Sequence, residues 1–369
     1  MSGAPDAAGA TLTIDLGALA ANWRLLRDRA APAECAAVVK ADAYGIGLEQ
    51  AGRALARAGC LTFFVAHPGE AIRLRAELPE AAIYVLNGLP SGAEQLFAAQ
   101  GLRPILGSWP ELRDWAAFCR SENRRHPAAL HVDTGMNRLG FRPEEAARLV
   151  ADDALGAIEP TLLMSHLVAA EEPVRDVNAR QIRAFDVVRA TLTDIPASLA
   201  NSAGIFLPQR PHHALVRPGY ALYGGNPTPW TANPMRPVVR LEARIIQVRE
   251  VEGGETAGYN ARWTAPGPRR LATLSVGYAD GFLRSGSAAD GTGAAALVAG
   301  HPCPVVGTIS MDLTILDVTD APRAERGDAA VLIGDGLEID EVGRRAGTIG
   351  YEILTSLGRR YARRYLDEA

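Results

Sequence analysis

The sequence predicts an α/β fold class, with an N-terminal (β/α)8 TIM barrel followed by a C-terminal mainly-β domain. Eight short apolar runs alternate with amphipathic helical stretches between residues 34 and about 225. Beyond Gly225 this pattern gives way to short strands separated by turns that contain glycine. The length of 369 residues also exceeds what one compact core usually holds. We therefore predict a barrel over residues 11–230 and a β domain over residues 231–369.

The predicted barrel strands are short apolar runs. They cover residues 36–40, 62–66, 82–86, 103–106, 129–133, 161–165, 197–200 and 220–223. Helical patterns separate most of them, over residues 69–78, 93–100, 109–120, 144–151 and 177–191. A further helix over residues 16–29 is expected to close the bottom of the barrel. An open, doubly wound sheet would show the same alternation, but no GxGxxG segment opens the first helix.

The C-terminal part begins after a linker that Asn-Pro and Thr-Pro pairs mark at residues 226–234. Strands are predicted over residues 238–251, 271–276, 295–298, 304–309, 313–318 and 329–333, with one helix near 340–345. These elements predict a small β barrel or sandwich.

Bulk properties exclude several classes of protein. The formal net charge is −4, and no basic stretch is interleaved with aromatic residues, so nucleic-acid binding is not expected. No apolar run approaches the ~18–20 residues of a membrane span, and residues 1–11 lack the pattern of a signal peptide. The four cysteines are scattered and the seven histidines show no ligand spacing. We expect a cytoplasmic, disulfide-free protein without a metal site and without nucleic-acid or membrane partners.

Lys40 is the only lysine in the chain, so 37 of the 38 Lys and Arg residues are arginines. A guanidinium stays protonated, whereas a desolvated lysine amine can lose its proton and attack a carbonyl group. Lys40 also follows an apolar run at the predicted end of a strand, where α/β proteins build their sites. These observations favour covalent amine chemistry over the alternative that one surface lysine persists by chance.

Other polar segments adjoin predicted barrel strands and should meet Lys40 at one mouth of the barrel. They are residues 133–138, 165–166, 201–204 and 217–220. Small residues near the last two strands are where such barrels commonly bind phosphate. A reactive amine beside a phosphate site indicates pyridoxal 5'-phosphate, which offers an aldehyde and a phosphate.

Each of these residues also has a simpler structural interpretation. His166 could be a hydrogen-bonded structural residue, and Arg138 and Arg217 could form surface ion pairs. Residues 201–202 could cap the following helix, and Tyr278 could be a turn residue. The order of the segments along the chain, rather than any single residue, favours the functional interpretation.

The chain resembles the alanine racemases, which are fold-type III pyridoxal-phosphate enzymes, over about residues 11–365. Residues 38–47 are similar to the family's cofactor-attachment signature, and residues 133–138, 216–220, 258–261, 277–281, 310–312 and 350–352 resemble further family segments in the same order. The resemblance implies interconversion of L-alanine and D-alanine, either for peptidoglycan synthesis or for alanine catabolism. It also implies a homodimer with two shared active sites, to which the C-terminal domain contributes.

By this resemblance, Lys40 binds the cofactor covalently and acts as one catalytic base, and Tyr259 of the other subunit acts as the second. Two bases on opposite faces of the α-carbon suit racemisation, because one removes a proton while the other supplies one. A tyrosine titrates near ~10, so Tyr259 must be activated. His166, with Arg217 behind it, matches the group that contacts this tyrosine. Arg217 also matches the arginine at the pyridine nitrogen, which would limit side reactions.

The resemblance implies the remaining site residues as well. Cofactor contacts are expected from Tyr44, Asn201, Ser202, Gly219, Tyr220 and Tyr351. Substrate contacts are expected from Arg138, Met311 and Asp312, and from Tyr278 in the access channel of the partner subunit.

One position departs from the family pattern. Many members carry a carbamylated lysine on the fifth strand, where it orients the arginine equivalent to Arg138, but this chain has His131 there. Because Lys40 is the only lysine, no other lysine can carry a carbamate, and His131 is the candidate for holding Arg138. Asn260 and Arg262 also stand where smaller residues are common beside the second base.

Three other functions fit parts of the pattern. A serine or broad-specificity racemase of the same fold would tolerate one extra hydroxyl, which a small pocket rejects by only about 10²-fold. A decarboxylase of basic amino acids would place a carboxylate at the pyridine nitrogen, where this chain has Arg217. A non-catalytic cofactor-binding barrel would lack the C-terminal domain that supplies Tyr259 and Met311.

Overall fold

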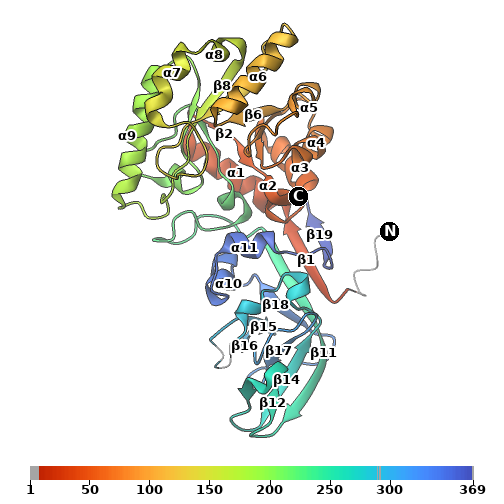
Figure 1. The fold of residues 1–369 in the computed structure, drawn as a ribbon. Helices are drawn as coiled ribbons and strands as arrows, with labels where there is room; N and C mark the ends of the chain where they lie inside the picture. The colour runs from red at the N-terminus through yellow and green to blue at the C-terminus, as the bar shows by residue number, and fades with distance from the viewer. Residues whose placement is uncertain (1–7, 289, 291, 368–369) are drawn as a thin grey trace.

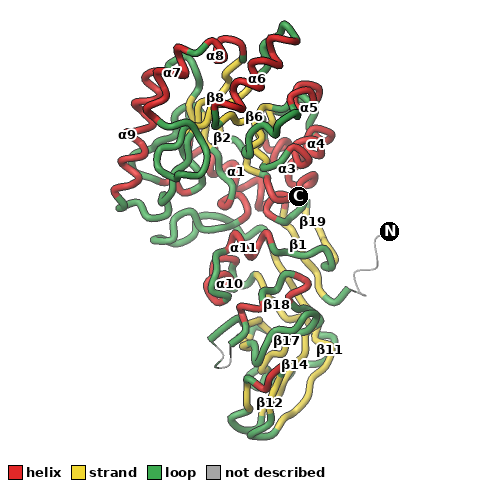
Figure 2. Tube along the Cα trace, viewed as in Figure 1, coloured by secondary structure: helices red, strands yellow, loops and turns green. Residues whose placement is uncertain are grey.

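A computed structural model describes residues 8–288, 290 and 292–367, and predictions that concern residues 1–7, 289, 291 and 368–369 lie outside the described residues. The chain folds into an upper and a lower lobe (Figure 1). Helices surround the strands of the upper lobe, whereas strands dominate the lower lobe (Figure 2). Among the described helices, none combines the length and the apolar character that crossing a bilayer requires.

The upper lobe confirms the predicted parallel barrel. Its first strand is divided into two short strands, β2 and β3. Strand β3 begins a seven-stranded sheet whose strands follow one another in chain order, from β3 to β9. The barrel closes because the last strand pairs with the first, and because the N–H groups of Ala214 and Arg217 donate to the carbonyls of Ala197 and Ala200. The strands are β2 (Glu34–Cys35), β3 (Ala37–Val38), β4 (Thr62–Val65), β5 (Ala82–Val85), β6 (Arg103–Leu106), β7 (Pro127–His131), β8 (Glu159–Met164), β9 (Ala197–Ser198) and β10 (Leu215–Val216).

The predicted position of the last barrel strand, residues 220–223, is wrong. The strand is β10, and Tyr220–Tyr223 forms the short 3-10 helix η4. This segment is apolar because it packs beneath the first helix, where Asn22 Nδ2 donates to the carbonyl of Leu222 at 3.1 Å. An apolar run of four residues does not distinguish a strand from a buried helical turn.

The helices of the upper lobe agree with the predicted ranges to within a few residues at most boundaries. The first helix begins where Asp15 accepts the N–H of Ala18 at 2.8 Å, and it lies at the bottom of the barrel, where Trp23 donates to the carbonyl of Cys35. The helices are α1 (Leu16–Ala30), α2 (Lys40–Tyr44), α3 (Leu48–Ala58), α4 (Pro68–Glu77), α5 (Glu94–Ala99), α6 (Trp109–Ser121), η2 (Pro143–Glu145), α7 (Ala146–Ala151), α8 (Asp153–Ala157), α9 (Asp176–Thr191) and η3 (Ala203–Phe206).

The lower lobe is organised around one long strand, β11 (Val239–Val251), whose first half alternates between buried and partly buried residues. The sheet runs in the order β16-β15-β18-β11-β1-β19, and β14 pairs with β11 and β17. The other strands are β1 (Ala10–Asp15), β12 (Thr256–Ala257), β13 (Trp263–Thr264), β14 (Arg269–Leu274), β15 (Ala295–Val298), β16 (His301–Pro304), β17 (Thr314–Asp317), β18 (Ala329–Ile333) and β19 (Ala362–Leu366).

Two predictions about the lower lobe need correction. Strand β1 pairs with β11 and β19, so residues 10–15 belong to the lower sheet, although the predicted barrel begins at residue 11. The strand predicted at residues 304–309 lies earlier, as β16, and Val305 adds only an isolated bridge to Leu316. Both misplacements arise because strand pairing depends on distant partners, which a local apolar pattern does not reveal.

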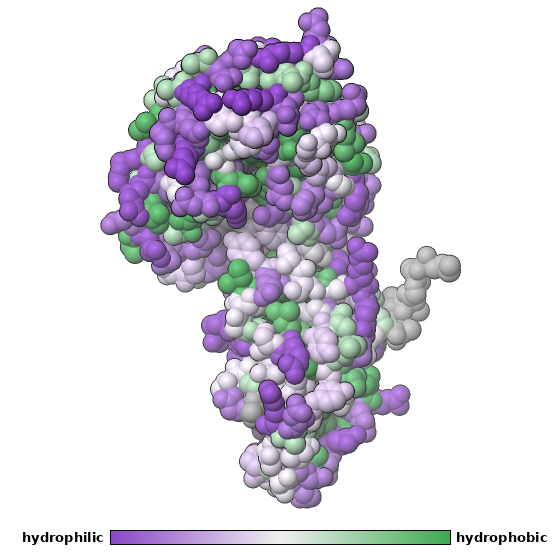
Figure 3. All heavy atoms as spheres, viewed as in Figure 1, coloured by the Kyte–Doolittle hydropathy of each residue, from purple (hydrophilic) through white to green (hydrophobic). Residues whose placement is uncertain are grey.

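Two short helices, α10 (Ile339–Arg345) and α11 (Gly350–Thr355), lie where the lobes meet (Figure 1). Leu354 in α11 lies very close to Gly45 of the barrel. A Cβ at position 45 would lie 2.2 Å from the Leu354 carbonyl oxygen, so only glycine fits at this position. One continuous apolar core includes residues of both lobes. On the face drawn in Figure 3, hydrophilic residues cover most of the upper lobe.

Candidate active site at the mouth of the barrel

A pocket of about 760 Å³ opens at the carboxyl ends of the barrel strands. It brings together most of the site residues expected from the sequence. They are Lys40, Tyr44, His131, Arg138, His166, Asn201, Ser202, Arg217, Gly219, Tyr220 and Tyr351. The pocket wall also includes Asn87, Thr348 and Ile349, which were not predicted as site residues. Asn87 follows the end of β5. Its place after a barrel strand was the one feature of the sequence that could have marked it as a site residue.

Lys40 begins an unusual turn directly after the first barrel strand. Residues Ala41, Asp42, Ala43 and Tyr44 all have positive φ angles of 52–56°, which is the left-handed region. Each such residue costs roughly 1–2 kcal/mol, and strain of this kind persists only where surrounding contacts hold it. Here Glu70 accepts the Asp42 N–H at 3.2 Å, and Arg73 donates to the Asp42 carboxylate at 2.8 Å. The turn is therefore held in one conformation beside the reactive amine.

The environment of Lys40 favours a neutral amine. Burial lowers the pKa of its ammonium group, and the positive charge of Arg138 lowers it further, while Glu70 acts in the opposite direction. A lysine with a lowered pKa has more of the unprotonated form that attacks carbonyl groups. Lys40 therefore has both the position and the electrostatic environment of a nucleophile.

Arg217 extends from β10 into the floor of the pocket, where it is 4% exposed. Its guanidinium donates to the Ser198 hydroxyl and, at 2.5 Å, to the Ser165 carbonyl. Burial lowers the pKa of Arg217 to about 9, so the side chain remains charged at neutral pH. Among the described residues it forms no ion pair. A guanidinium has five N–H donors, so some remain for a ligand.

His131 ends strand β7, His166 follows the neighbouring strand β8, and both line the pocket. Burial lowers the pKa of His131 to about 4, with a further contribution from Arg217. Burial and Arg217 lower the pKa of His166 to about 3. Both imidazoles are therefore neutral at physiological pH, and each keeps a lone pair that can accept a hydrogen bond.

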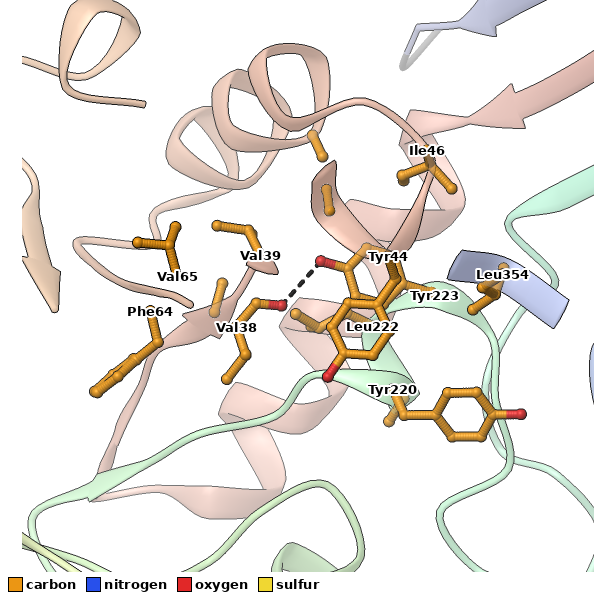
Figure 4. Packing of buried hydrophobic residues seen from close by; sticks show 14 of the residues in the cluster. Val38, Val39, Tyr44, Ile46, Phe64, Val65, Tyr220, Leu222, Tyr223 and Leu354 are labelled. Carbon is orange, nitrogen blue, oxygen red and sulfur yellow. Dashed lines mark hydrogen bonds between the residues drawn. The ribbon is translucent and has the colours of Figure 1, made fainter. Parts of the chain in front are cut away.

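One end of the pocket combines small residues with polar groups. The Ser202 hydroxyl oxygen accepts the N–H groups of Gly219 at 3.0 Å and Ala221 at 3.3 Å, which leaves its own hydrogen for a ligand. A Cβ at Gly219 would lie 2.4 Å from the Tyr44 hydroxyl, so only glycine fits. Tyr44 stacks on Tyr223, whose hydroxyl donates to the Val38 carbonyl (Figure 4). Ser202, Gly219 and Tyr44 thus form a rigid polar cradle.

The side chain of Asn201 forms hydrogen bonds within the barrel lobe, one of them to the short helix η3 that follows it. Its side-chain oxygen accepts the Gly204 N–H at 2.9 Å, and its amide donates to the Leu167 carbonyl. The capping interpretation raised by the sequence therefore holds for the side chain, although Asn201 also lines the pocket.

Arg138 is exposed on the loop after β7 and makes no hydrogen bond or ion pair within the described chain.

The remaining predicted site residues lie in the lower lobe, outside this pocket. Tyr259 is 68% exposed at the tip of the β12–β13 hairpin, where Trp263 lies in a small apolar cluster with Leu271 and Val306. Tyr278 and Met311 are 41% and 54% exposed, and the Tyr278 N–H donates to the Ser310 carbonyl next to Met311. Arg360 pairs with Asp312 at 2.7 Å. One chain alone does not bring these residues to Lys40.

Comparison with known proteins identifies the family. The family model described as "Alanine racemase, N-terminal domain" matches residues 14–227, and the model described as "Alanine racemase, C-terminal domain" matches residues 238–365. The chain belongs to the alanine racemase family. The match of the two models covers both lobes of the molecule.

Individual members of the family are similar to this chain over almost its full length. The alanine racemase of Methylobacterium nodulans is 66% identical over 361 residues, which are 97% of this chain and 96% of the relative. The alanine racemase of Acidiphilium cryptum is 52% identical and spans 96% of this chain and 98% of the relative. The crystal structure of alanine racemase from Bartonella henselae with covalently bound pyridoxal phosphate has 42% sequence identity and a TM-score of 0.93. That comparison covers 97% of this chain and 100% of the other.

The lowered pKa values of the two buried histidines predict how the stability of the protein depends on pH. An unfolded histidine titrates near ~6.5, whereas His131 and His166 titrate lower in the folded chain. As the pH falls below about 6.5, the unfolded chain takes up protons that the folded chain does not, so the free energy of unfolding should decrease towards pH 4. Urea unfolding between pH 7 and pH 4 measures this slope. The substitution His131→Asn should make it shallower, whereas His301→Asn, at an exposed histidine, should leave it unchanged. Equal slopes in all three proteins would contradict the conclusion that buried His131 contributes to the pH dependence of stability.

Proposed function

We propose that this chain interconverts L-alanine and D-alanine with pyridoxal 5'-phosphate as cofactor, using two bases. The observation that supports this proposal most strongly is Lys40, the only lysine of the chain, whose lowered pKa and strained turn lie at the mouth of the barrel. The similarity to alanine racemases over both lobes supports the same reaction.

The pocket fits this cofactor. Lys40 supplies an amine for its aldehyde, and the cradle of Ser202, Gly219 and Tyr44 leaves space and donors for its phosphate. Arg217 has a buried guanidinium with donors to spare for the ring nitrogen. The lining is strongly basic, and Glu352 is the one carboxylate among the described lining residues. A basic pocket suits a ligand that carries phosphate and carboxylate groups.

When bound, pyridoxal phosphate supplies an electron sink that acidifies the α-hydrogen of an attached amino acid. The amine of Lys40, whose pKa burial lowers, can remove or return that proton on one face of the α-carbon. Tyr259 of the partner subunit serves the opposite face, and neutral His166, with Arg217 behind it, can accept a hydrogen bond from it. Arg138 and Met311 hold the substrate carboxylate, Asp312 is a further substrate-binding residue, and Tyr278 borders the access channel.

We infer a homodimer from the incomplete site. Tyr259, Tyr278 and Met311 are exposed on the lower lobe, and the pocket of the same chain contains none of them. A two-fold dimer that places the lower lobe of one chain over the barrel mouth of the other would complete both sites at once.

Proton NMR of L-alanine in D2O with the cofactor-loaded protein, followed by chiral analysis, tests the function. Loss of the α-proton signal together with formation of D-alanine is the expected result. Exchange without inversion would contradict the role of Tyr259. Exchange with serine but not with alanine would favour a serine racemase, and absence of exchange with either would favour a non-catalytic cofactor-binding protein.

We predict that His131→Ala raises KM for alanine by about five- to tenfold and changes kcat much less, an effect comparable to one lost hydrogen bond. Arg138 is exposed and has no other partner within the described chain, whereas neutral His131 lies on the same pocket wall and can accept a hydrogen bond. Steady-state kinetics in both directions measure the effect. His301→Ala is the control, because His301 is exposed in the lower lobe. An unchanged KM in the His131 variant would refute the orienting role.

A further inference from the structure

The side chain of Tyr220 has a partner outside the pocket that it lines. Its ring points away from Tyr44 and Tyr223 (Figure 4), and its hydroxyl donates to Asp340 Oδ1 at 2.5 Å. The residue is only 4% exposed, and burial and the Asp340 carboxylate raise its pKa, so the hydroxyl keeps its proton and remains the donor. Because this hydroxyl is occupied by Asp340, Tyr220 can reach a cofactor phosphate only through its backbone.

Asp340 joins the end of the barrel to the lower lobe. It lies in the first turn of α10, where an acidic side chain is favourable. Its second oxygen, Oδ2, accepts the N–H of Asn226 at 2.9 Å. One carboxylate thus holds both η4 and the linker that follows the barrel. Hydrogen bonds to a charged acceptor are about twice as strong as neutral ones.

The Tyr220 ring lies in a closely fitted slot against Tyr351. The two rings are stacked with their centroids 3.8 Å apart and their planes 10° apart. A Cβ at Gly225 would lie 2.1 Å from the Tyr220 ring, and a Cβ at Gly350 would lie 1.8 Å from its hydroxyl. Since the Tyr351 ring stacks on this ring and Gly350 immediately precedes Tyr351, a shift of the Tyr220 ring towards either residue would also displace the ring of Tyr351.

We propose that Tyr220 and Asp340 are positioning residues, which fix the Tyr351 ring at the phosphate end of the pocket and thereby set the affinity for the cofactor. The proposal rests on the proposed function and on the contact with the cofactor phosphate that the resemblance to alanine racemases implies for Tyr351. It adds a connection between the lobes, because Tyr220 belongs to the barrel and Asp340 to α10 of the lower lobe. The pair takes no part in proton transfer.

The test measures the dissociation constant for pyridoxal 5'-phosphate in the full-length protein, by titrating the absorbance that the cofactor acquires on bonding to Lys40. The variants are Tyr220→Phe, which removes only the hydroxyl, and Asp340→Ala, with Asp340→Asn as the conservative rescue. Tyr84→Phe is the matched control. Tyr84 is also a buried barrel tyrosine stacked on an aromatic ring, its hydroxyl donates to Thr161, and it lies outside the pocket wall.

We expect about tenfold weaker cofactor binding for Tyr220→Phe and Asp340→Ala, which corresponds to the loss of one charge-assisted hydrogen bond. Asp340→Asn keeps one of the two acceptor oxygens and should recover part of the affinity. Saturating cofactor should restore kcat in Asp340→Ala, which a general loss of folded structure would not allow. Tyr84→Phe should bind the cofactor as the parent does.

Other results would overturn the proposal. Unchanged affinity in Tyr220→Phe and Asp340→Ala would show that the pair does not control the site. An equal loss in Tyr84→Phe would indicate general loosening of the barrel. If Asp340→Ala does not fold, unchanged affinity in Tyr220→Phe decides against the proposal by itself. Absence of Lys40-dependent absorbance in the parent protein would instead refute the proposed function.

Discussion

Replacing Lys40 with arginine should reduce racemisation by at least about 10⁴-fold, because a guanidinium can neither attack the cofactor aldehyde nor shuttle the α-proton. The chain offers an unusually clean test, because it has no second lysine. Reduction of the cofactor-loaded protein with borohydride, followed by mass spectrometry, should show one attached cofactor per chain, on Lys40. The Lys40→Arg variant should show none.

The control for this experiment is Arg73→Lys. Arg73 is partly exposed outside the pocket wall and pairs with Asp42 and Glu49, so the variant adds a second lysine while it keeps a positive charge at that position. It should still carry one cofactor, on Lys40. Cofactor attached at position 73 of this variant, or turnover that persists in Lys40→Arg, would contradict the assignment of Lys40 as the nucleophile.

The second large effect is expected at Tyr259, which lies on the lower lobe. Tyr259→Phe should reduce kcat by about 10²–10⁴-fold, the usual contribution of a general acid or base, while cofactor binding persists. The substitution removes only the hydroxyl of a residue that is 68% exposed in the chain, so folding should be unaffected. Turnover in both directions and the absorbance of the bound cofactor measure the two properties separately.

Mixing two inactive variants tests whether the sites are shared. A mixed dimer of Lys40→Ala and Tyr259→Phe chains has one site with both bases intact and one site with neither. Random assortment of equal amounts should therefore restore about one quarter of the parental activity if the interface is two-fold. Either variant alone should stay inactive. A mixture that stays inactive after exchange of subunits would refute the shared site, and full activity of Tyr259→Phe would refute the second base.

Much of the fold was predictable because the barrel has a strong local signature. Parallel strands are buried on both faces, so runs such as the one that contains Phe63 and Phe64 are apolar without interruption, and amphipathic helices lie between them. The segment that begins at Tyr220 is the exception, since η4 is equally buried but is not a strand. Strand β1 was missed because its partners, β11 and β19, lie more than two hundred residues away in the sequence.

The site was predictable to the extent that chemistry restricts the choice of residue. A sole lysine after a buried strand, and an arginine beside the last strand, stand out in the sequence. The left-handed turn from Ala41 to Tyr44 does not, because alanine and aspartate there give no sign of positive φ angles. The hydrogen bond from Tyr220 to Asp340 joins residues 120 positions apart, and nothing local indicates it.

The sequence alone determined the barrel, the second domain and the family, and it singled out Lys40 as the candidate nucleophile, because periodicity, composition and reactive residue types are local properties of the chain. Only the tertiary structure decided which hydroxyls are free for a ligand and which already have partners, which carboxylate joins the lobes, and that Tyr259 is remote from Lys40 within one chain. These properties depend on packing between distant segments, where burial sets the charge of His131 and close contact leaves room for nothing larger than glycine.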